Sequence, residues 1–201
     1  MKSTSVKVNE KGKGISEALA LTENIGKESG LERKPLLHLR LLAEEMFGML
    51  RGIAGNVEAD YWIESEGKHF ELHMKSDIDM TFSLKDQFLA VSSSGKNEAS
   101  RGFMGRIKVM IADIMLSSKE TMPYTMVNTA VSYPMGAVFD EIAVVWSMAL
   151  YKEDVQSHIS ESEKASEAWD ELEKSIVANI ADDVKVKIIG NDVEMIVVKS
   201  F

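Results

Sequence analysis

The chain has 201 residues, of which 45% are hydrophobic and 27% are charged, and its formal net charge is -9 at pH 7. This length and hydrophobic content predict one domain built around a single core and argue against an intrinsically disordered chain. The acidic balance argues against a protein that coats nucleic acid or an anionic membrane, because both partners favour a basic surface.

Three further features narrow the class of protein. The absence of cysteine excludes disulfides, zinc-thiolate sites and thiol catalysis. The segment 1–14 carries charges but no apolar stretch, which is unlike a secretory signal. The longest apolar run, 142–150, is too short to span a bilayer. We therefore expect a soluble cytoplasmic protein that binds neither nucleic acid nor membrane.

The first part of the chain predicts one strand, two helices and a hairpin. An edge strand is expected near 6–8, a helix at 15–28 that ends before Gly30, and a longer helix from Pro35 to about Ile53. A hairpin follows, with strands at 61–63 and 70–74 and a turn at 65–68.

The second strand of this hairpin alternates between two kinds of side chain, which predicts one covered and one wet face. The residues expected to face the core are Phe70, Leu72 and Met74. The residues expected to face water are His69, Glu71, His73 and Lys75.

The second part of the chain predicts more helices and a final hairpin. An amphipathic helix should reach Met115, and 138–151 is also expected to be helical. Ser160 and Glu163 form a capping-box pattern before a helix whose apolar face holds Trp169, Leu172, Ile176 and Ile180. Strands at 184–188 and 193–198 flank a turn at 190–192.

These elements predict an α+β two-layer sandwich, with a mixed, mostly antiparallel sheet and helices on one face. We expect a single domain, 1–201, with a helical insertion or cap at about 117–160. Methionines concentrate from Met104 to Met148. Methionine fills irregular cores and also suits adaptable surfaces, so this segment could pack internally or bind a protein partner.

The segment 92–115 has the pattern of an anion-binding site. A small polar loop containing Ser94, Gly95, Lys96 and Asn97 leads into a helix, and basic residues outnumber the one acid, Glu98, between Gly95 and Lys108. Backbone N–H groups of such a loop and of a helix N-terminus attract phosphate or carboxylate. The loop lacks the first glycine and the Ser or Thr of a P-loop, so we reject that motif.

Glu45 is a candidate functional acid on the second helix. Its neighbours at helical spacing are Leu41, Leu42 and Met49, whereas Glu44 lies next to Arg40 and can pair with it. An acid on an apolar face needs a partner, a metal-bound ligand or a cleft. A carboxylate at the rim of the core, partly in water, is the structural alternative.

Two further groups of polar residues follow the strands. Asp77 and Asp79 come after the hairpin and could bind a base or a metal, although aspartates are also common turn formers. His69, Glu71 and His73 share one strand face and could hold a divalent metal, but a solvated face explains them equally well. We assign no metal site from the sequence.

The order of these elements resembles the GHKL superfamily of ATP-binding domains, in particular small anti-sigma-factor kinases and the ATPase domains of histidine kinases. In that family a helix carries a Glu and, four residues on, an Asn that helps to hold magnesium. An aspartate turn reads adenine, a glycine-rich lid leads to a phosphate-binding helix, and a terminal hairpin closes the sheet. The segments 41–49, 77–79 and 101–107 resemble the three motifs, and the resemblance covers about 15–116 and 183–198.

The resemblance implies a Bergerat-like fold and a regulatory bacterial protein that binds ATP or a related phosphate ligand, with Glu45 as the candidate general base. Asp79 or Asp77 would accept a hydrogen bond from the adenine amino group. The residues implied around the phosphates are Ser94, Gly95, Lys96, Asn97, Gly102 and Gly105.

The magnesium-binding Asn is absent from its expected place. Gly48 stands four residues after Glu44, and Met49 four residues after Glu45. Magnesium would then need more waters or other carboxylates. The alternative is a nucleotide-free scaffold that keeps the fold and presents 117–160 to a protein partner.

Overall fold

The structure is a computed structural model, and it describes residues 1–50, 57–79, 103–120 and 144–201. Its elements in chain order are β1 (Val6–Asn9), α1 (Ile15–Glu28), α2 (Arg33–Leu50), β2 (Glu58–Glu66), β3 (His69–Asp77), α4 (Phe103–Glu120), β4 (Val144–Ser147), α5 (Met148–His158), α6 (Glu163–Lys174), α7 (Ile176–Ile180), β5 (Asp183–Ile189) and β6 (Asp192–Ser200).

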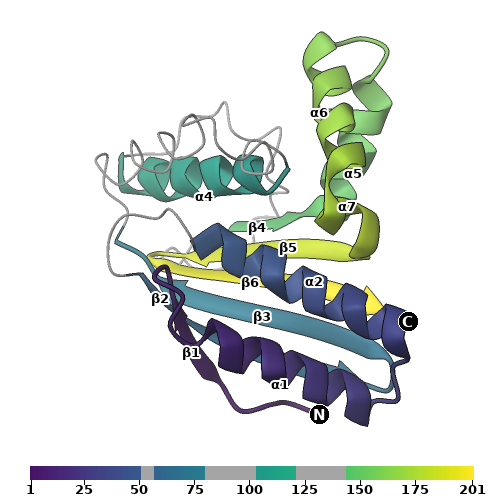
Figure 1. The fold of residues 1–201 in the computed structure, drawn as a ribbon. Coiled ribbons are helices and arrows are strands. Elements are labelled where there is room, and N and C mark those ends of the chain that lie inside the picture. Colours follow the sequence, from purple (N-terminus) through teal and green to yellow (C-terminus); the bar gives the residue numbers. More distant parts are fainter. Residues whose placement is uncertain (51–56, 80–102, 121–143) are drawn as a thin grey trace.

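The strands form one six-stranded sheet in the order β1-β2-β3-β6-β5-β4, and every neighbouring pair is antiparallel. Helices α1 and α2 lie side by side across one face of the sheet, and the α5–α6 pair projects away from it (Figure 1). The predicted α+β class with a mostly antiparallel sheet is confirmed.

The core lies between the sheet and the helices α1 and α2. Tyr61 on β2 is fully buried, and its hydroxyl group lies 2.7 Å from the Oγ1 atom of Thr22 on α1. The Phe47 ring of α2 packs edge-on against Tyr61 with ring centroids 4.8 Å apart. Buried hydroxyl groups need hydrogen-bond partners, so this pair fixes how α1 sits on the sheet.

The N-terminal elements and the final hairpin agree with the sequence patterns. β1, α1 and both predicted hairpins are present, with β2 and β3 longer than expected. α2 begins at Arg33, so Pro35 lies in its first turn, where the missing N–H has no helical partner to lose. The predicted end of this helix near Ile53 lies outside the described residues.

The prediction of a helix over 138–151 is wrong for Val144–Ser147 and holds from Met148 onward. Val144–Ser147 form β4, and the helix α5 begins only at Met148. β4 pairs with β5 so that Val144 faces Ile188 and Trp146 faces Val186. β-branched and aromatic residues favour a strand where a neighbouring strand is available. Thus the segment predicted as an insertion supplies an edge strand of the sheet.

The predicted helix start at Ser160 is also wrong. α6 begins at Glu163 with Ser162 as its N-cap residue, and no side-chain hydrogen bond caps it. The helix ends at Lys174. The next residue, Ser175, is the N-cap of α7, and its hydroxyl oxygen accepts a hydrogen bond from the Ala178 N–H. The expected continuous apolar face is broken there, since Leu172 is 3% exposed but Ile176 is 47% exposed.

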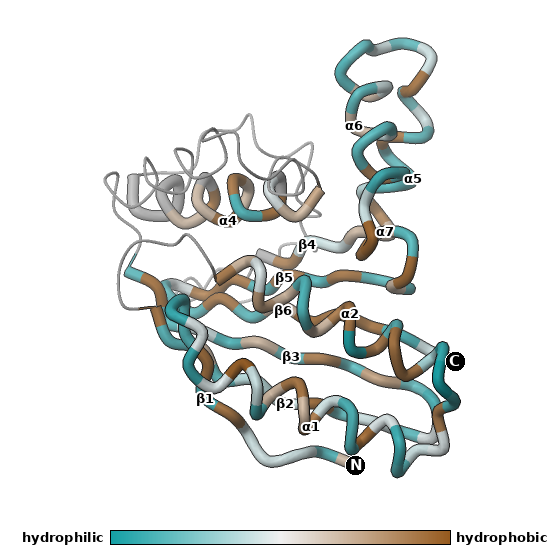
Figure 2. Tube along the Cα trace, viewed as in Figure 1, coloured by the Kyte–Doolittle hydropathy of each residue, from teal (hydrophilic) through white to brown (hydrophobic). Residues whose placement is uncertain are grey.

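The two faces of β3 differ as predicted, with one exception. Phe70, Leu72 and Met74 are buried beneath the helices, and hydropathy changes from residue to residue along the strands (Figure 2). On the other face, His73 is buried although it was expected to face water. Trp62 of β2 is paired with His73 in the strand register and covers its ring.

Within the described ranges, no helix combines the length and the apolar character that crossing a membrane would require. The projecting α5 and α6 helices are mostly hydrophilic along their length (Figure 2).

Two glycines before α1 allow a direct test of the β1–α1 connection. Gly12 and Gly14 have φ angles of +89° and +77°. A Cβ atom on Gly14 would collide with the Lys7 carbonyl oxygen, whereas one on Gly12 would meet nothing within 4 Å in the described part of the chain. Gly12→Ala should lower the free energy of unfolding by about 1 kcal/mol, the usual cost of positive φ. Gly14→Ala should lower the free energy of unfolding by roughly 2 kcal/mol more than Gly12→Ala does, because the backbone at Lys7 or Gly14 must move to accommodate the new Cβ atom. Urea denaturation measures both, and equal losses would contradict this contact.

Candidate functional site

The structure describes four of the predicted site residues, Glu45, Asp77, Asp79 and Gly105. The remaining ones lie outside the described residues: Ser94, Gly95, Lys96, Asn97 and Gly102.

Glu45 lies on the C-terminal half of α2 and is partly buried. Burial, together with the neighbouring negative charge of Glu44, raises the pKa of the Glu45 carboxyl. The Arg40 guanidinium pairs with Glu23 and, at 2.9 Å from Nε, with the Oε1 atom of Glu44. The predicted pairing of Arg40 with Glu44 is therefore confirmed.

Gly48 leaves open space beside Glu45. It lies three residues further along α2, so the two share a side of the helix. Gly48 is exposed, and a Cβ atom placed on it would meet no atom of the described residues within 4 Å. Because glycine has no side chain, the backbone of α2 is bare at this position beside Glu45.

Asp77 and Asp79 lie at the end of β3 and are both exposed. Between them, Ile78 is buried and its N–H donates to the carbonyl oxygen of Asn191, 2.9 Å away, in the turn between β5 and β6. This bond continues the β3–β6 ladder beyond its last pair, Asp77 and Asp192. Side chains alternate along extended backbone, so the buried Ile78 directs both aspartates toward solvent.

On α4, Lys108 stands out because burial lowers its pKa to about 8. It lies four residues from Met104 and from Ala112, both of which are buried, so it belongs to the inner side of the helix. Gly105, one turn earlier, is buried as well. A lysine with this pKa is held where its charged form lacks much of its normal hydration.

The elements that carry these residues meet at one side of the fold. α2 and β3 both end there, and α4 lies on the same side (Figure 1). α4 contacts α2, and the Phe103 ring at its start packs against Trp146 of β4 with ring centroids 6.0 Å apart. Lys108 and Glu45, a cationic and an acidic residue that are each partly buried, thus lie on neighbouring helices.

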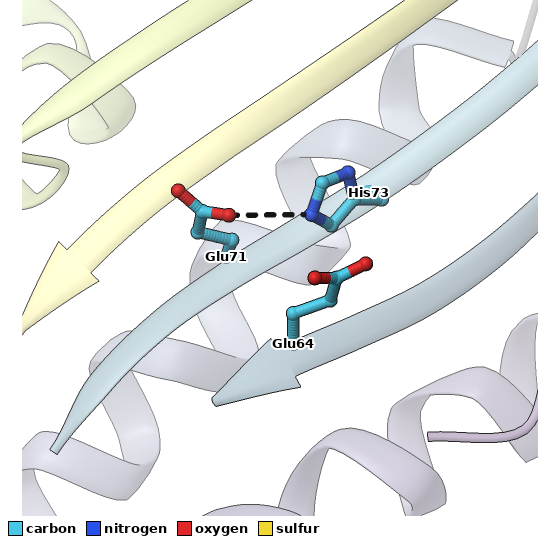
Figure 3. Close-up of side chains that lie close together, drawn as sticks. All are labelled: Glu64, Glu71 and His73. Atoms are coloured by element: carbon cyan, nitrogen blue, oxygen red, sulfur yellow. Dashed lines mark ion pairs between the residues drawn. The ribbon is translucent and has the colours of Figure 1, made fainter. Parts of the chain in front are cut away.

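The three residues of β3 weighed as possible metal ligands are only partly brought together. Glu71 has one carboxylate oxygen 3.9 Å from His69 Nε2 and the other 3.6 Å from His73 Nε2. His69 is exposed, however, and its Nδ1 atom lies 2.9 Å from the Ser200 hydroxyl. Instead of His69, the structure adds Glu64 of β2 to Glu71 and His73 (Figure 3). Sequence spacing along β3 could not identify Glu64, because it joins the group only through the register of β2 and β3.

The chain matches no family model, no curated protein and no solved structure.

The burial of Lys108 should appear in the pH dependence of stability. Its pKa is about 8 in the folded protein against an ordinary value of 10.5. Between these pH values the unfolded chain binds more protons, so stability should rise with pH in this window. Lys108→Met should be more stable than the natural chain at pH 7, by about 1–3 kcal/mol, and the difference should shrink by pH 10.

Urea denaturation of both proteins at several pH values between 7 and 10 measures this difference. Other titrating groups are common to the two chains and cancel in the comparison. A difference that stays constant with pH would show that Lys108 keeps an ordinary pKa in the folded protein.

Proposed function

We propose that the protein is a cytoplasmic bacterial regulatory protein with a divergent GHKL-like fold that binds ATP or a related phosphate ligand where α2, the end of β3 and α4 come together. The observation that carries the proposal is Lys108, whose charged form is disfavoured by burial on the inner side of α4. A bound phosphate would favour the protonated form of this lysine and would in turn be held by its charge.

The order of the elements supports the same proposal. A Glu-bearing helix (α2) precedes a strand (β3) that ends in an aspartate turn, and a further helix (α4) and a terminal hairpin (β5–β6) follow. This is the order on which the resemblance to the GHKL superfamily rests. A Bergerat-like sandwich is therefore part of the proposal.

Each candidate residue would have its own role in binding the ligand. Asp79, or Asp77, would accept a hydrogen bond from the adenine amino group at the exposed end of β3. Lys108 would join Lys96 and the glycines of the 94–105 segment around the phosphates. Glu45, with its raised pKa, would polarise a water or a metal ion and is the candidate general base if phosphoryl transfer occurs.

Magnesium would be held differently from the family pattern. Gly48 offers no side-chain oxygen at the position of the family's Asn. Because magnesium keeps several waters and binds through one or two carboxylates plus phosphate oxygens, Glu45 and the ligand would have to suffice. Binding of the nucleotide is thus better supported than its hydrolysis.

The second candidate is a nucleotide-free scaffold that presents the 117–160 segment to a protein partner. Gly48 and Met49 favour it, because both stand where the magnesium ligand would be expected. Within the described part of that segment, Leu150 on α5 is 43% exposed.

Calorimetric titration with ATP and a non-hydrolysable analogue, with and without magnesium, separates the two candidates. We expect saturable binding, weakened about 10-fold or more in Asp79→Ala and in Lys108→Met, since hydrogen bonds involving charged groups contribute roughly 1.5–3 kcal/mol.

Asp154→Ala is the matched control, because it removes an exposed acid on α5 and should leave the affinity unchanged. No binding at millimolar nucleotide would overturn the proposal in favour of the scaffold. Normal binding by both Asp79→Ala and Lys108→Met would show that the ligand binds elsewhere.

A further inference from the structure

Three side chains converge on the face of the sheet that α1 and α2 leave uncovered. Glu64 of β2 and Glu71 and His73 of β3 each offer one donor atom, and these atoms all lie within 4.8 Å of one another (Figure 3). We call these residues the open-face cluster. They lie on the strand face opposite to Ile63, Phe70 and Leu72, which are fully buried in the core.

His73 is held as a metal-binding histidine would be. Its side chain is 8% exposed, and its Nδ1 atom lies 2.9 Å from the Oε1 atom of Glu194 on β6. The ring stacks on Trp62 with centroids 4.7 Å apart and an angle of 9° between the planes. A carboxylate on one ring nitrogen orients the other toward a metal and makes it more basic.

The second ring nitrogen points into the cluster without a hydrogen bond. His73 Nε2 is buried and has no hydrogen-bond partner among the described residues, and its neighbour is Glu71 Oε2 at 3.6 Å. A buried polar atom of this kind normally has a partner. A metal ion between His73 and Glu71 would provide one.

The two carboxylates add a second reason for a cation. Glu64 and Glu71 are directly opposite each other in the β2–β3 register, where like charges are destabilising. Lys2 lies 2.9 Å from Glu64 Oε1, but its side chain is 62% exposed, and exposed ion pairs contribute little. Trp62 Nε1 also donates a hydrogen bond to Glu64 Oε1, so a cation would bind the other carboxylate oxygen of Glu64, Oε2.

We propose that the open-face cluster binds one divalent first-row transition-metal ion, for which zinc is the best probe. One imidazole and two carboxylates suit zinc and its neighbours in the series, whereas magnesium prefers an all-oxygen shell. Donors bound to zinc at about 2.0–2.1 Å lie about 3.3 Å apart. Rotation of the partly exposed Glu64 and Glu71 side chains closes the remaining gap, and water completes the coordination.

The site is independent of the proposed nucleotide site. It lies at mid-strand on the open face, while Asp77 and Asp79 lie at the end of β3. A doubly protonated His73 is the competing explanation for the cluster. It would donate from Nε2 to Glu71 and from Nδ1 to Glu194, and it would leave no lone pair for a metal.

The test is calorimetric titration of the metal-free, untagged full chain with zinc. We expect one zinc ion per chain, and binding at least about 10-fold weaker in Glu71→Gln and in Glu64→Gln. Glu194→Gln, which removes a positioning residue, should weaken binding about 10- to 100-fold. The control is Glu66→Gln, an exposed residue of the same hairpin with the same change in chemistry, which should bind as the natural chain does.

Two further readouts guard against variants that simply unfold. At a fixed zinc concentration, zinc should raise the melting temperature of the natural chain more than that of Glu71→Gln. In the natural chain, zinc and not magnesium should shift the nitrogen-15 resonance of His73 Nε2. No zinc binding, an unmoved His73 resonance, or equal losses in Glu66→Gln and Glu71→Gln would overturn the proposal.

Discussion

The pairing of β3 with β6 is the constraint on which the rest of the structure depends. It runs from the His69–Ser200 pair to the Asp77–Asp192 pair and joins the hairpin of the first part of the chain to the hairpin at its end. The other strands are arranged outward from this central pair. The ladder closes a long stretch of chain, so its cost in conformational entropy must be offset by the apolar surface that α1 and α2 cover.

The same ladder brings together both groups of polar residues. At its end, the bond from Ile78 to Asn191 holds the Asp77 and Asp79 segment beside the β5–β6 turn. At its middle, Glu194 of β6 reaches His73 of β3. Because neighbouring side chains on a strand point to opposite faces, β3 can contribute to the core and carry the open-face cluster at once. The register of β3 with its neighbouring strands therefore determines both which residues meet in the core and which meet on the open face.

Sequence patterns predicted what depends on one segment at a time. The alternation of Phe70, Leu72 and Met74 and the pairing of Arg40 with Glu44 were read correctly, because each involves neighbours along the chain. The run ending in β4 was misread as helix, since a short apolar run fits a helix or a paired strand, and the partner β5 decides. The sequence did not identify Glu64 as a neighbour of His73, and it predicted that His73 faces water. Both errors have the same cause, because the position of β2 beside β3 determines the surroundings of these residues.

The charged residues fall into two groups, exposed ion pairs and partly buried groups, and this difference bears on function. Pairs such as Lys75 with Asp192 lie in solvent, where each partner keeps its hydration and contributes little to stability. Lys108 and Glu45 differ, because burial disfavours the charged form of each. Stability alone would favour an apolar side chain at such positions. Ionisable groups held in partly buried positions are typical of sites that bind or transform a charged ligand, which is why the side of the fold shared by α2 and α4 carries the functional proposal.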